Sequence, residues 1–160
     1  MSAAPFYLVQ CAKEKAAGPC RARLLYRGDW FTKARAFVES TGHEWRILSA
    51  EYGVVHPDRV IDTYDKCVRD MGRESRDAWG IMCAGMLHNL LHAHTGPVVF
   101  LAGLHYREAI LVRPATRSSN AGPRNYPFVA RATVPMDGLG IGQQKAWLKA
   151  QTQLMEVARG

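Results

Sequence analysis

Short apolar runs alternate along the chain with longer segments in which apolar residues recur every three or four positions. The short runs are rich in β-branched or aromatic residues and are bounded by Gly or Pro, a pattern typical of strands. Four such runs cover residues 6–10 (FYLVQ), 45–50 (WRILSA), 97–103 (PVVFLAG) and 128–134 (FVARATV). The pattern therefore predicts about four strands.

The segments between and after these runs have the periodicity of amphipathic helices. One helix is expected to begin at Asp29, a capping residue, and to stop at Gly42. Others are expected near 74–94, from Leu104, and from about 142 to the C-terminal region. Strands that alternate with helices predict an α/β fold, a three-layer sandwich in which a mainly parallel central sheet has helices on both faces.

Composition narrows the class of protein. A chain of 160 residues, 48% hydrophobic and 22% charged, can enclose one core, so residues 1–160 are predicted to form a single domain. No leader and no apolar stretch of roughly 20 residues is evident, so we expect a cytoplasmic protein without a membrane partner. The four cysteines form no CxxC pair, which argues against a disulfide framework or zinc ribbon. We expect neither a metal nor a cofactor.

The net charge of +7 is concentrated in two segments. Residues 11–35 contain seven basic and two acidic residues, and residues 109–136 contain four arginines and no acid. Clustered cations bind a nucleic-acid backbone by releasing its counterions. Backbone contacts are therefore predicted for Arg21, Arg23, Arg113, Arg117 and Arg124. A solvated surface that binds nothing is the alternative, and segment 113–127 is either a substrate loop or a mobile linker.

Polar residues follow three predicted strands at the place where ligands bind in α/β folds. Ligands occupy the crevice outside the carboxyl ends of the strands, where CAKEK, SAEYG and AGLHYRE begin. We expect one pocket, with phosphates held by basic side chains and a base stacked on tyrosine. The predicted substrate-binding residues are Cys11, Lys13, Lys15, Ser49, Tyr52, Gly53, Gly103, Tyr106 and Arg107. The alternative is that these residues have structural roles only. The lysines would lie on the surface, Cys11 would be a buried thiol, Gly53 would permit a tight turn, and Arg107 would form a salt bridge.

The segment DTYD, residues 62–65, supplies two carboxylates and a tyrosine after an apolar pair. Cleavage of an N-glycosidic bond creates positive charge on the sugar, which a nearby carboxylate can stabilise or trap. Asp62 is the first candidate for this catalytic role, Asp65 would orient it or position water, and Tyr64 would contact the substrate. The alternative is an ordinary turn in which Asp and Thr bond to the backbone.

Two further segments contain residue types that occur in ligand sites. GLGIGQQ, residues 138–144, matches neither a dinucleotide loop nor a Walker loop, but it leads into a helix. Gly140 and Gln143 are therefore predicted to contact the substrate, with a simple turn as the alternative. HNLLH, residues 88–92, lacks the glutamate of an HExxH zinc site. His56 and His105 flank the predicted pocket as candidate acid–base groups, with surface histidines as the alternative.

Four blocks, LVQCAKEK, ILSAEYGVVHPDRVIDTYD, VVFLAGLHYREAI and MDGLGIGQQKAWL, resemble in order and spacing the bacterial and phage domain-of-unknown-function family 6884. The resemblance covers residues 7–148. That family is similar, more distantly, to the YaaA-type peroxide-stress proteins and to the fold of uracil-DNA glycosylases. The resemblance implies an α/β fold, nucleic-acid binding and, as in some relatives of the wider group, chemistry at the bond between base and sugar. The basic insertion RPATRSSNAGPRNYP is longer than the family pattern.

These features predict a nucleic-acid-binding enzyme, with DNA as the expected partner, that cleaves or exchanges an N-glycosidic bond as a DNA glycosylase does. A base inside a duplex would be flipped out to reach the pocket. Two alternatives remain open. One is a non-catalytic DNA-binding module, and the other is an enzyme that processes free nucleosides or nucleotides.

Overall fold

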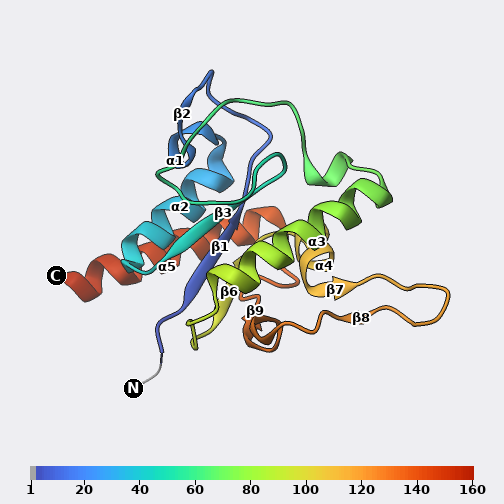
Figure 1. Cartoon of the computed structure of the whole chain (residues 1–160). Helices are drawn as coiled ribbons and strands as arrows, with labels where there is room; N and C mark the ends of the chain where they lie inside the picture. Colours follow the sequence, from blue (N-terminus) through green and yellow to red (C-terminus); the bar gives the residue numbers. More distant parts are fainter. Residues whose placement is uncertain (1–2) are drawn as a thin grey trace.

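A five-stranded sheet forms the centre of the computed structural model, which describes residues 3–160 (Figure 1). Its strands are β1 (Phe6–Gln10), β3 (Trp45–Ser49), β4 (Gly53–Val55), β6 (Val98–Leu101) and β9 (Ala132–Thr133), in the order β4-β3-β1-β6-β9. The β1, β3, β6 and β9 strands are parallel, and β4 pairs antiparallel with β3. The sheet is therefore mixed but mostly parallel.

The β1 strand is central because its side chains are buried on both faces of the sheet. Leu8 and Val9 are fully buried, and Val9 lies in register with Ile47 on one side and Leu101 on the other. A continuous apolar run such as FYLVQ is typical of a parallel strand covered on both faces.

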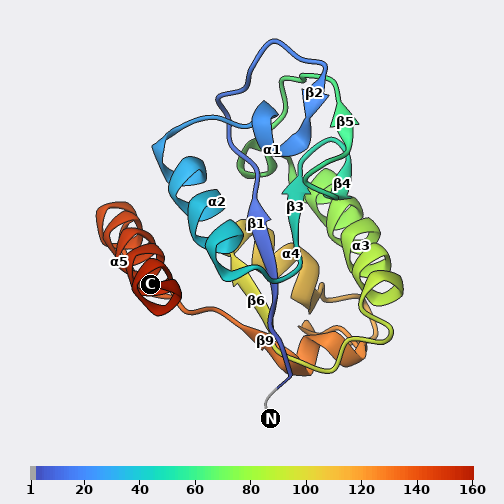
Figure 2. The same cartoon turned by 90° about the vertical axis from the view of Figure 1, so that its left-hand side faces the viewer.

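Four longer helices pack in two pairs beside this sheet. The α2 helix (Asp29–Thr41) packs against α5 (Ile141–Arg159), and α3 (Arg73–Leu90) packs against α4 (Leu104–Leu111). Figure 2 shows α2 and α5 on one side of β1 and α3 on the other. Phe37 of α2 contacts both β1 and α5, because its ring centroid lies 5.5 Å from those of both Tyr7 and Trp147.

Short elements complete the described part of the chain. The α1 helix (Ala22–Leu25) lies next to a small antiparallel pair, β2 (Cys20–Arg21) with β5 (Val60–Ile61). A hairpin of β7 (Val112–Arg113) and β8 (Gly122–Pro123) follows α4. The 3-10 helices are η1 (Val68–Asp70), before α3, and η2 (Pro127–Arg131), before β9. Within residues 3–160, no helix has the length and apolar content needed to cross a bilayer.

The chain changes direction across the sheet at β1. From β1 it passes through α2 to β3 on one side, then returns through α3 to β6 on the other side. The connections on the two sides of β1 therefore diverge between β1 and β6. A crevice for ligands is expected at this topological switch point.

The α/β class and the mostly parallel sheet predicted from the pattern are confirmed, with differences in detail. The sheet has five strands rather than about four, because the three-residue β4 is too short to give a periodic signal. Most of the predicted strand 128–134 is the η2 helix, where Pro127 at the first position already has the backbone angle of a helical turn. Asp29 is the first helical residue rather than the cap, which is Gly28 with φ of 97°. Gly42 ends α2 as predicted, in the left-handed conformation.

Candidate functional site

A cavity of about 620 Å³ opens beyond the carboxyl ends of β1 and β6. We call it the crossover cavity. Its walls come from the loop after β1, the first turns of α2 and α4, the start of α5 and the segment around η1. The lining residues are Gln10, Cys11, Ala12, Lys13, Glu14, Arg27, Gly28, Asp29, Trp30, Phe31, Cys67, Arg69, Asp70, His105, Tyr106, Ile141 and Lys145. Its volume lies in the range of small-molecule sites.

Three helices of the described chain begin at this cavity, each with a glycine as its N-cap. These glycines are Gly28 for α2, Gly103 for α4 and Gly140 for α5. Glycine has no side chain to bond the free backbone N–H groups of a first turn. The partial positive charge of the three helix ends therefore adds to that of the surrounding cations and favours an anionic ligand group.

The crossover cavity is lined by charges of both signs. Its cations are Lys13, Arg27, Arg69 and Lys145, and its carboxylates are Glu14, Asp29 and Asp70. Hydrogen bonds from Lys33 and then Lys145 hold the pKa of Asp29 below its usual range. The Lys145–Asp29 pair, at 3.1 Å, anchors α5 to the start of α2. The cavity thus combines groups that attract an anion with carboxylates that can stabilise a cation.

Two buried residues join opposite walls of the crossover cavity. The sulfur of Cys11, just after β1, lies 3.4 Å from the hydroxyl oxygen of Tyr106 in α4. Burial, with a smaller effect of Cys11, raises the pKa of Tyr106 well above its usual range. The Tyr106 hydroxyl therefore stays neutral and can both donate and accept a hydrogen bond. Both residues were predicted for the pocket from sequence, and both line it.

A second cavity of about 500 Å³ adjoins the first. We call it the side cavity; it is lined by Lys13, Asp65, Lys66, Cys67, Asp70 and Met71. Lys13, Cys67 and Asp70 line both cavities. The structure thus brings Asp65 into the same region as Lys13, a pair that the sequence places more than fifty positions apart.

Asp62 occupies a different position. Its side chain is exposed, and its Oδ1 accepts a 2.8 Å hydrogen bond from the backbone N–H of Thr63. Among the described residues that line the crossover and side cavities, Asp62 does not occur. The two carboxylates of DTYD therefore lie in different surroundings, and the catalytic role of Asp62 stays a prediction.

Ser49 and Tyr64 form part of a closed ring of three hydroxyls with Tyr26. The distances are 3.0 Å from Tyr26 to Ser49, 2.9 Å from Ser49 to Tyr64 and 2.8 Å from Tyr64 to Tyr26. Ser49 is fully buried, and its Oγ also accepts a bond from the N–H of Tyr52. These hydroxyls bind one another and fasten the DTYD segment to the end of β3.

Tyr52 and Lys15 pack beside this ring. The Tyr52 hydroxyl donates to the carbonyl of Asp62 at 3.4 Å, and the Arg59 guanidinium lies 5.4 Å from the Tyr52 ring centroid. The Lys15 ammonium lies 4.4 Å from the Tyr64 ring centroid and donates to the Lys13 carbonyl. Neither residue is among those lining the two described cavities.

Arg107 and Gly53 have structural contacts. The Arg107 guanidinium donates to the carbonyl of Ala102 at 3.0 Å and to Asp137 at 3.4 Å. Gly53 has φ of 74°, and a Cβ there would lie 2.8 Å from the sulfur of Met86. The turn into β4 therefore requires a residue without a side chain.

The predicted residues of GLGIGQQ bond to each other. The N–H of Gly140 donates to Oε1 of Gln143 at 3.0 Å, closing the first turn of α5. Gly103 has a comparable bond, from its N–H to Oε1 of Gln10 at 2.6 Å. Both glycines thus lie at helix starts near the crossover cavity.

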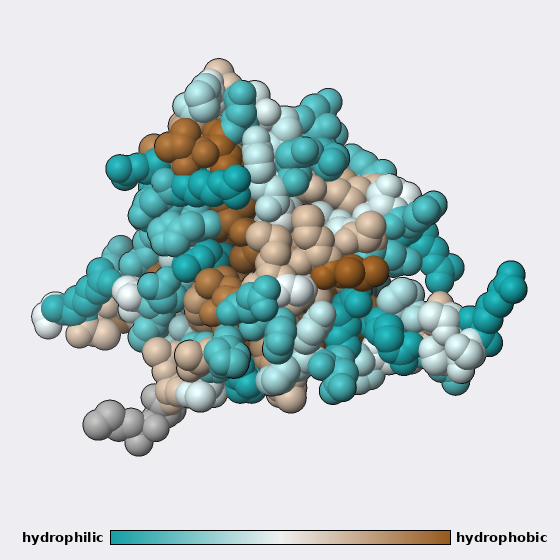
Figure 3. Space-filling view, viewed as in Figure 1, coloured by the Kyte–Doolittle hydropathy of each residue, from teal (hydrophilic) through white to brown (hydrophobic). Residues whose placement is uncertain are grey.

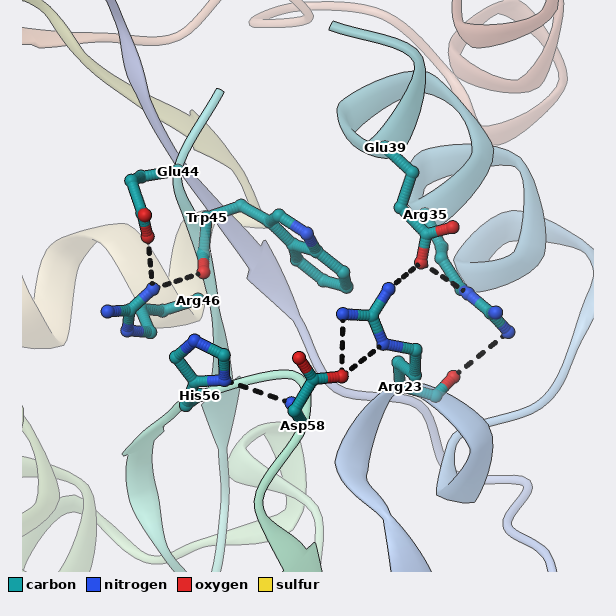
Figure 4. Close-up of polar contacts among 8 residues, drawn as sticks. All are labelled: Arg23, Arg35, Glu39, Glu44, Trp45, Arg46, His56 and Asp58. Atoms are coloured by element: carbon teal, nitrogen blue, oxygen red, sulfur yellow. Dashed lines mark hydrogen bonds and ion pairs between the residues drawn. The ribbon is translucent and has the colours of Figure 1, made fainter. Parts of the chain in front are cut away.

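Arg23, predicted to contact phosphates, is already paired with carboxylates. Figure 4 shows its guanidinium between Asp58 and Glu39, which also pairs with Arg35. The N–H of Asp58 donates to Nδ1 of His56, so His56 lies in this network. Arg21, on β2, is exposed.

The arginines of the β7–β8 hairpin differ in their surroundings. Arg113 donates to Ser119 and to the carbonyl of Asn120 within the hairpin. Arg124 donates to the carbonyls of Ile110 and Ala109 at the end of α4. For Arg117, which is exposed, residues 3–160 provide no hydrogen-bond or ion-pair partner. Figure 3 shows hydrophilic side chains at the tip of this hairpin.

Sequence reasoning missed most of the cavity wall, because only Cys11, Lys13, His105 and Tyr106 among the lining residues had been placed at or beside the pocket. The missed residues with polar or charged side chains are Gln10, Glu14, Arg27, Asp29, Cys67, Arg69, Asp70 and Lys145. A signal existed for those at the helix starts, because a helix that follows a parallel strand begins near that strand's carboxyl end. Nothing local identified the η1 segment. In the described residues, no group of three or more His, Cys, Asp or Glu side chains is arranged to hold a metal ion.

Comparison with protein families gives a match. The model of a family described as "Family of unknown function (DUF6884)" matches residues 6–150, which is most of the chain. Among curated proteins, none matches the chain.

Proposed function

The chain belongs to the DUF6884 family, a family of unknown function, and we propose that it is an enzyme that cleaves or exchanges an N-glycosidic bond. The crossover cavity would hold one nucleotide unit, and DNA is the proposed source of that unit. The distant similarity to YaaA-type proteins and uracil-DNA glycosylases, and a three-layer arrangement around the switch point, belong to the same proposal.

One observation carries the proposal. Four cations and three carboxylates line a single cavity at the crossover between β1 and β6. A nucleotide needs cations for its phosphate, and cleavage of its glycosidic bond needs a carboxylate beside the sugar. Trp30, which is half-buried, adds aromatic surface on which a base can stack.

The chemistry is assigned to the carboxylates near Lys13. Asp70 lines both cavities, and Asp65 lines the side cavity. As the bond between base nitrogen and C1′ breaks, its electron pair leaves with the base, and a carboxylate stabilises the cationic sugar. His105 or water supplies a proton to the departing base. Water, or an incoming base in the case of exchange, then bonds to C1′ and releases a proton.

One observation favours a second candidate function, an enzyme that acts on free nucleosides or nucleotides. Of the described residues in the β7–β8 hairpin, none lines the crossover cavity. A free nucleoside or nucleotide could therefore fill the cavity without the basic hairpin. A polymer substrate would instead extend from the cavity toward basic surface outside it.

The test measures release of base by mass spectrometry. The full chain is incubated with DNA containing unmodified and modified bases and, separately, with free nucleosides and nucleoside monophosphates. Asp70→Asn and Asp65→Asn are expected to lower the rate of release by about a hundredfold or more, the usual contribution of such a group. Glu156→Gln, an exposed carboxylate on α5, is the matched control.

The outcomes separate the hypotheses. Loss of release only in Asp62→Asn would restore the role predicted from sequence and contradict the assignment to Asp65 and Asp70. Release from free nucleotides but not from DNA would favour the second function. If no base is released from any substrate and the three Asp variants bind DNA as the wild type does, the protein is a non-catalytic binding module.

A further inference from the structure

Gln10 is a cavity residue with a hydrogen-bonding group that the fold does not use. It is the last residue of β1, and it lines the crossover cavity at the switch point between β1 and β6. Its side chain reaches across that point to Gly103, the N-cap of α4. Gln10 is therefore held between the two strands whose ends define the cavity.

The hydrogen bond to Gly103 fixes the orientation of the Gln10 side-chain amide. The contact is 2.6 Å, from the backbone nitrogen of Gly103 to Oε1 of Gln10. A backbone N–H can only donate, so the amide atom that receives it must be the carbonyl oxygen. A Cβ at position 103 would lie 3.3 Å from Oε1, so a glycine leaves room for this contact.

The amide nitrogen of Gln10 is left as a donor. Within residues 3–160, no protein atom pairs with this Nε2. Across the same residues, no buried side-chain nitrogen or oxygen lacks a hydrogen-bond partner. The Gln10 nitrogen is therefore not sealed in the interior. Because Gln10 lines the crossover cavity, this nitrogen can donate to a ligand there.

We propose that Gln10 selects a nucleobase by donating to the oxygen that a keto base carries where its amino counterpart has an exocyclic amine, at C6 of a purine or C4 of a pyrimidine. A free glutamine amide can pair with a donor or an acceptor, but this one has its acceptor already occupied. It therefore favours a keto base, such as hypoxanthine or uracil, over the amino counterparts adenine and cytosine. An exocyclic amine would meet a second donor, and both groups would lose water without gaining a bond. The inference rests on the proposed nucleotide site and adds the chemical class of base.

The experiment compares ligands that differ in one exocyclic group. Dissociation constants of the full chain are measured by calorimetry for the 2′-deoxynucleoside 5′-monophosphates of hypoxanthine, adenine, uracil and cytosine. We expect the keto member of each pair to bind about tenfold more tightly, the effect of one hydrogen bond gained and one mismatch avoided. The ratio within each pair cancels the shared contribution of phosphate and sugar.

Gln10→Glu is the decisive variant. A carboxylate keeps an acceptor for the Gly103 N–H but replaces the donor with a second acceptor, so the keto preference should be lost or inverted. Gln153→Glu, the same change on the exposed surface of α5, should keep the preference. Gly103→Ala, which crowds Oε1, provides a second perturbation and should reduce it. Each ratio is obtained within one protein sample, so partial loss of folded protein does not affect it.

Failure of the inference differs from failure of the proposed function. Equal affinity of the wild type for keto and amino nucleotides, or a preference that survives Gln10→Glu, would overturn the role of Gln10 while leaving the nucleotide site in place. Failure of the wild type to bind any of the four nucleotides would overturn the nucleotide site and the inference together.

Discussion

At the scale of single residues, the hydroxyl groups of Tyr26, Ser49 and Tyr64 form hydrogen bonds with one another and so stabilise the fold. Each hydroxyl can donate once and accept, so three of them at 2.8–3.0 Å satisfy one another. Ser49 is the last residue of β3 and Tyr64 follows β5, and their role as ligand contacts stays a prediction. Their partner Tyr26 lies 23 and 38 positions away in sequence and carries no local signal.

The buried tyrosines predict a loss of stability in alkaline solution. Burial is the main cause that raises the pKa of Tyr26, Tyr64 and Tyr106 above the ordinary value of 10.0. The folded state therefore favours the neutral phenol. Its stability is complete below about pH 10, the unfolded value, and falls as the pH rises toward the folded values.

Tyr64→Phe should make that fall less steep, because one phenol no longer couples to folding. Each such group contributes a slope of at most about 1.4 kcal/mol per pH unit. Near neutral pH the same variant should have a free energy of unfolding lower by about 1–2 kcal/mol, since Tyr26 and Ser49 each lose a hydrogen-bond partner. Urea unfolding at a series of pH values from roughly 8 to 11 measures both effects. An unchanged slope would show that Tyr64 does not keep its proton in the folded state.

At the scale of elements, the contact between α3 and α4 depends on a glycine. A Cβ at Gly80 of α3 would overlap the carbonyl oxygen of Ala109 in α4. At Gly85, five residues further along the same helix, a Cβ would meet nothing within 4 Å. Gly80 thus permits close backbone packing, whereas Gly85 leaves open space.

Alanine at these two glycines is expected to have effects of opposite sign. Gly80→Ala should lower the free energy of unfolding by about 3 kcal/mol or more, because α4 must move away from α3. Gly85→Ala should raise it by about 0.5–1 kcal/mol, since alanine has less backbone entropy to lose in a helix. Chemical denaturation of both variants tests the pair. Similar effects at the two positions would contradict the close packing at Gly80.

The same pair illustrates how far the elements could be predicted. The apolar stripe of α3 is a local pattern, so the helix was predicted and its start was right within one residue, although α3 ends at Leu90 rather than at 94. What distinguishes Gly80 from Gly85 is the carbonyl of Ala109, and no local pattern contains it. The strand predicted over 128–134 is right only for Ala132–Thr133, which form β9, because the preceding apolar residues suit either a strand or the buried η2 turn that Pro127 favours.

At the scale of the whole molecule, the position of the crossover cavity follows from the topology, but most of the residues that line it do not. The rule that loops at the carboxyl ends of parallel strands converge assigned Cys11, Lys13 and Tyr106 to one pocket, and all three line the crossover cavity. It could not place Asp70, which reaches the cavity on the η1 segment rather than at a strand end. It also could not separate Asp65 from Asp62, because their difference lies in how the chain turns after β5.

The net charge of +7 is likewise not distributed as sequence alone implies. Arg23 is neutralised by Asp58 and Glu39, and Arg124 supports the end of α4. Arg117 lies instead in the hairpin that Figure 1 shows projecting from the body of the molecule. A polymer that enters the crossover cavity would need such surface outside it.

Arg117→Gln is therefore expected to weaken DNA binding without disturbing the cavity. The slope of log affinity against log salt concentration should fall by about 0.7 to 0.9, the effect of one phosphate contact, when measured by fluorescence anisotropy with labelled DNA. Nucleoside monophosphates should bind as before, because the hairpin does not contribute to the described cavity wall. Lys149→Gln removes the same charge from the exposed face of α5 and should leave the slope unchanged. Arg124→Gln should instead lower the melting temperature, since two carbonyls at the end of α4 lose their donor. If Lys149→Gln reduced the slope as much as Arg117→Gln, DNA would be responding to net charge rather than to the hairpin.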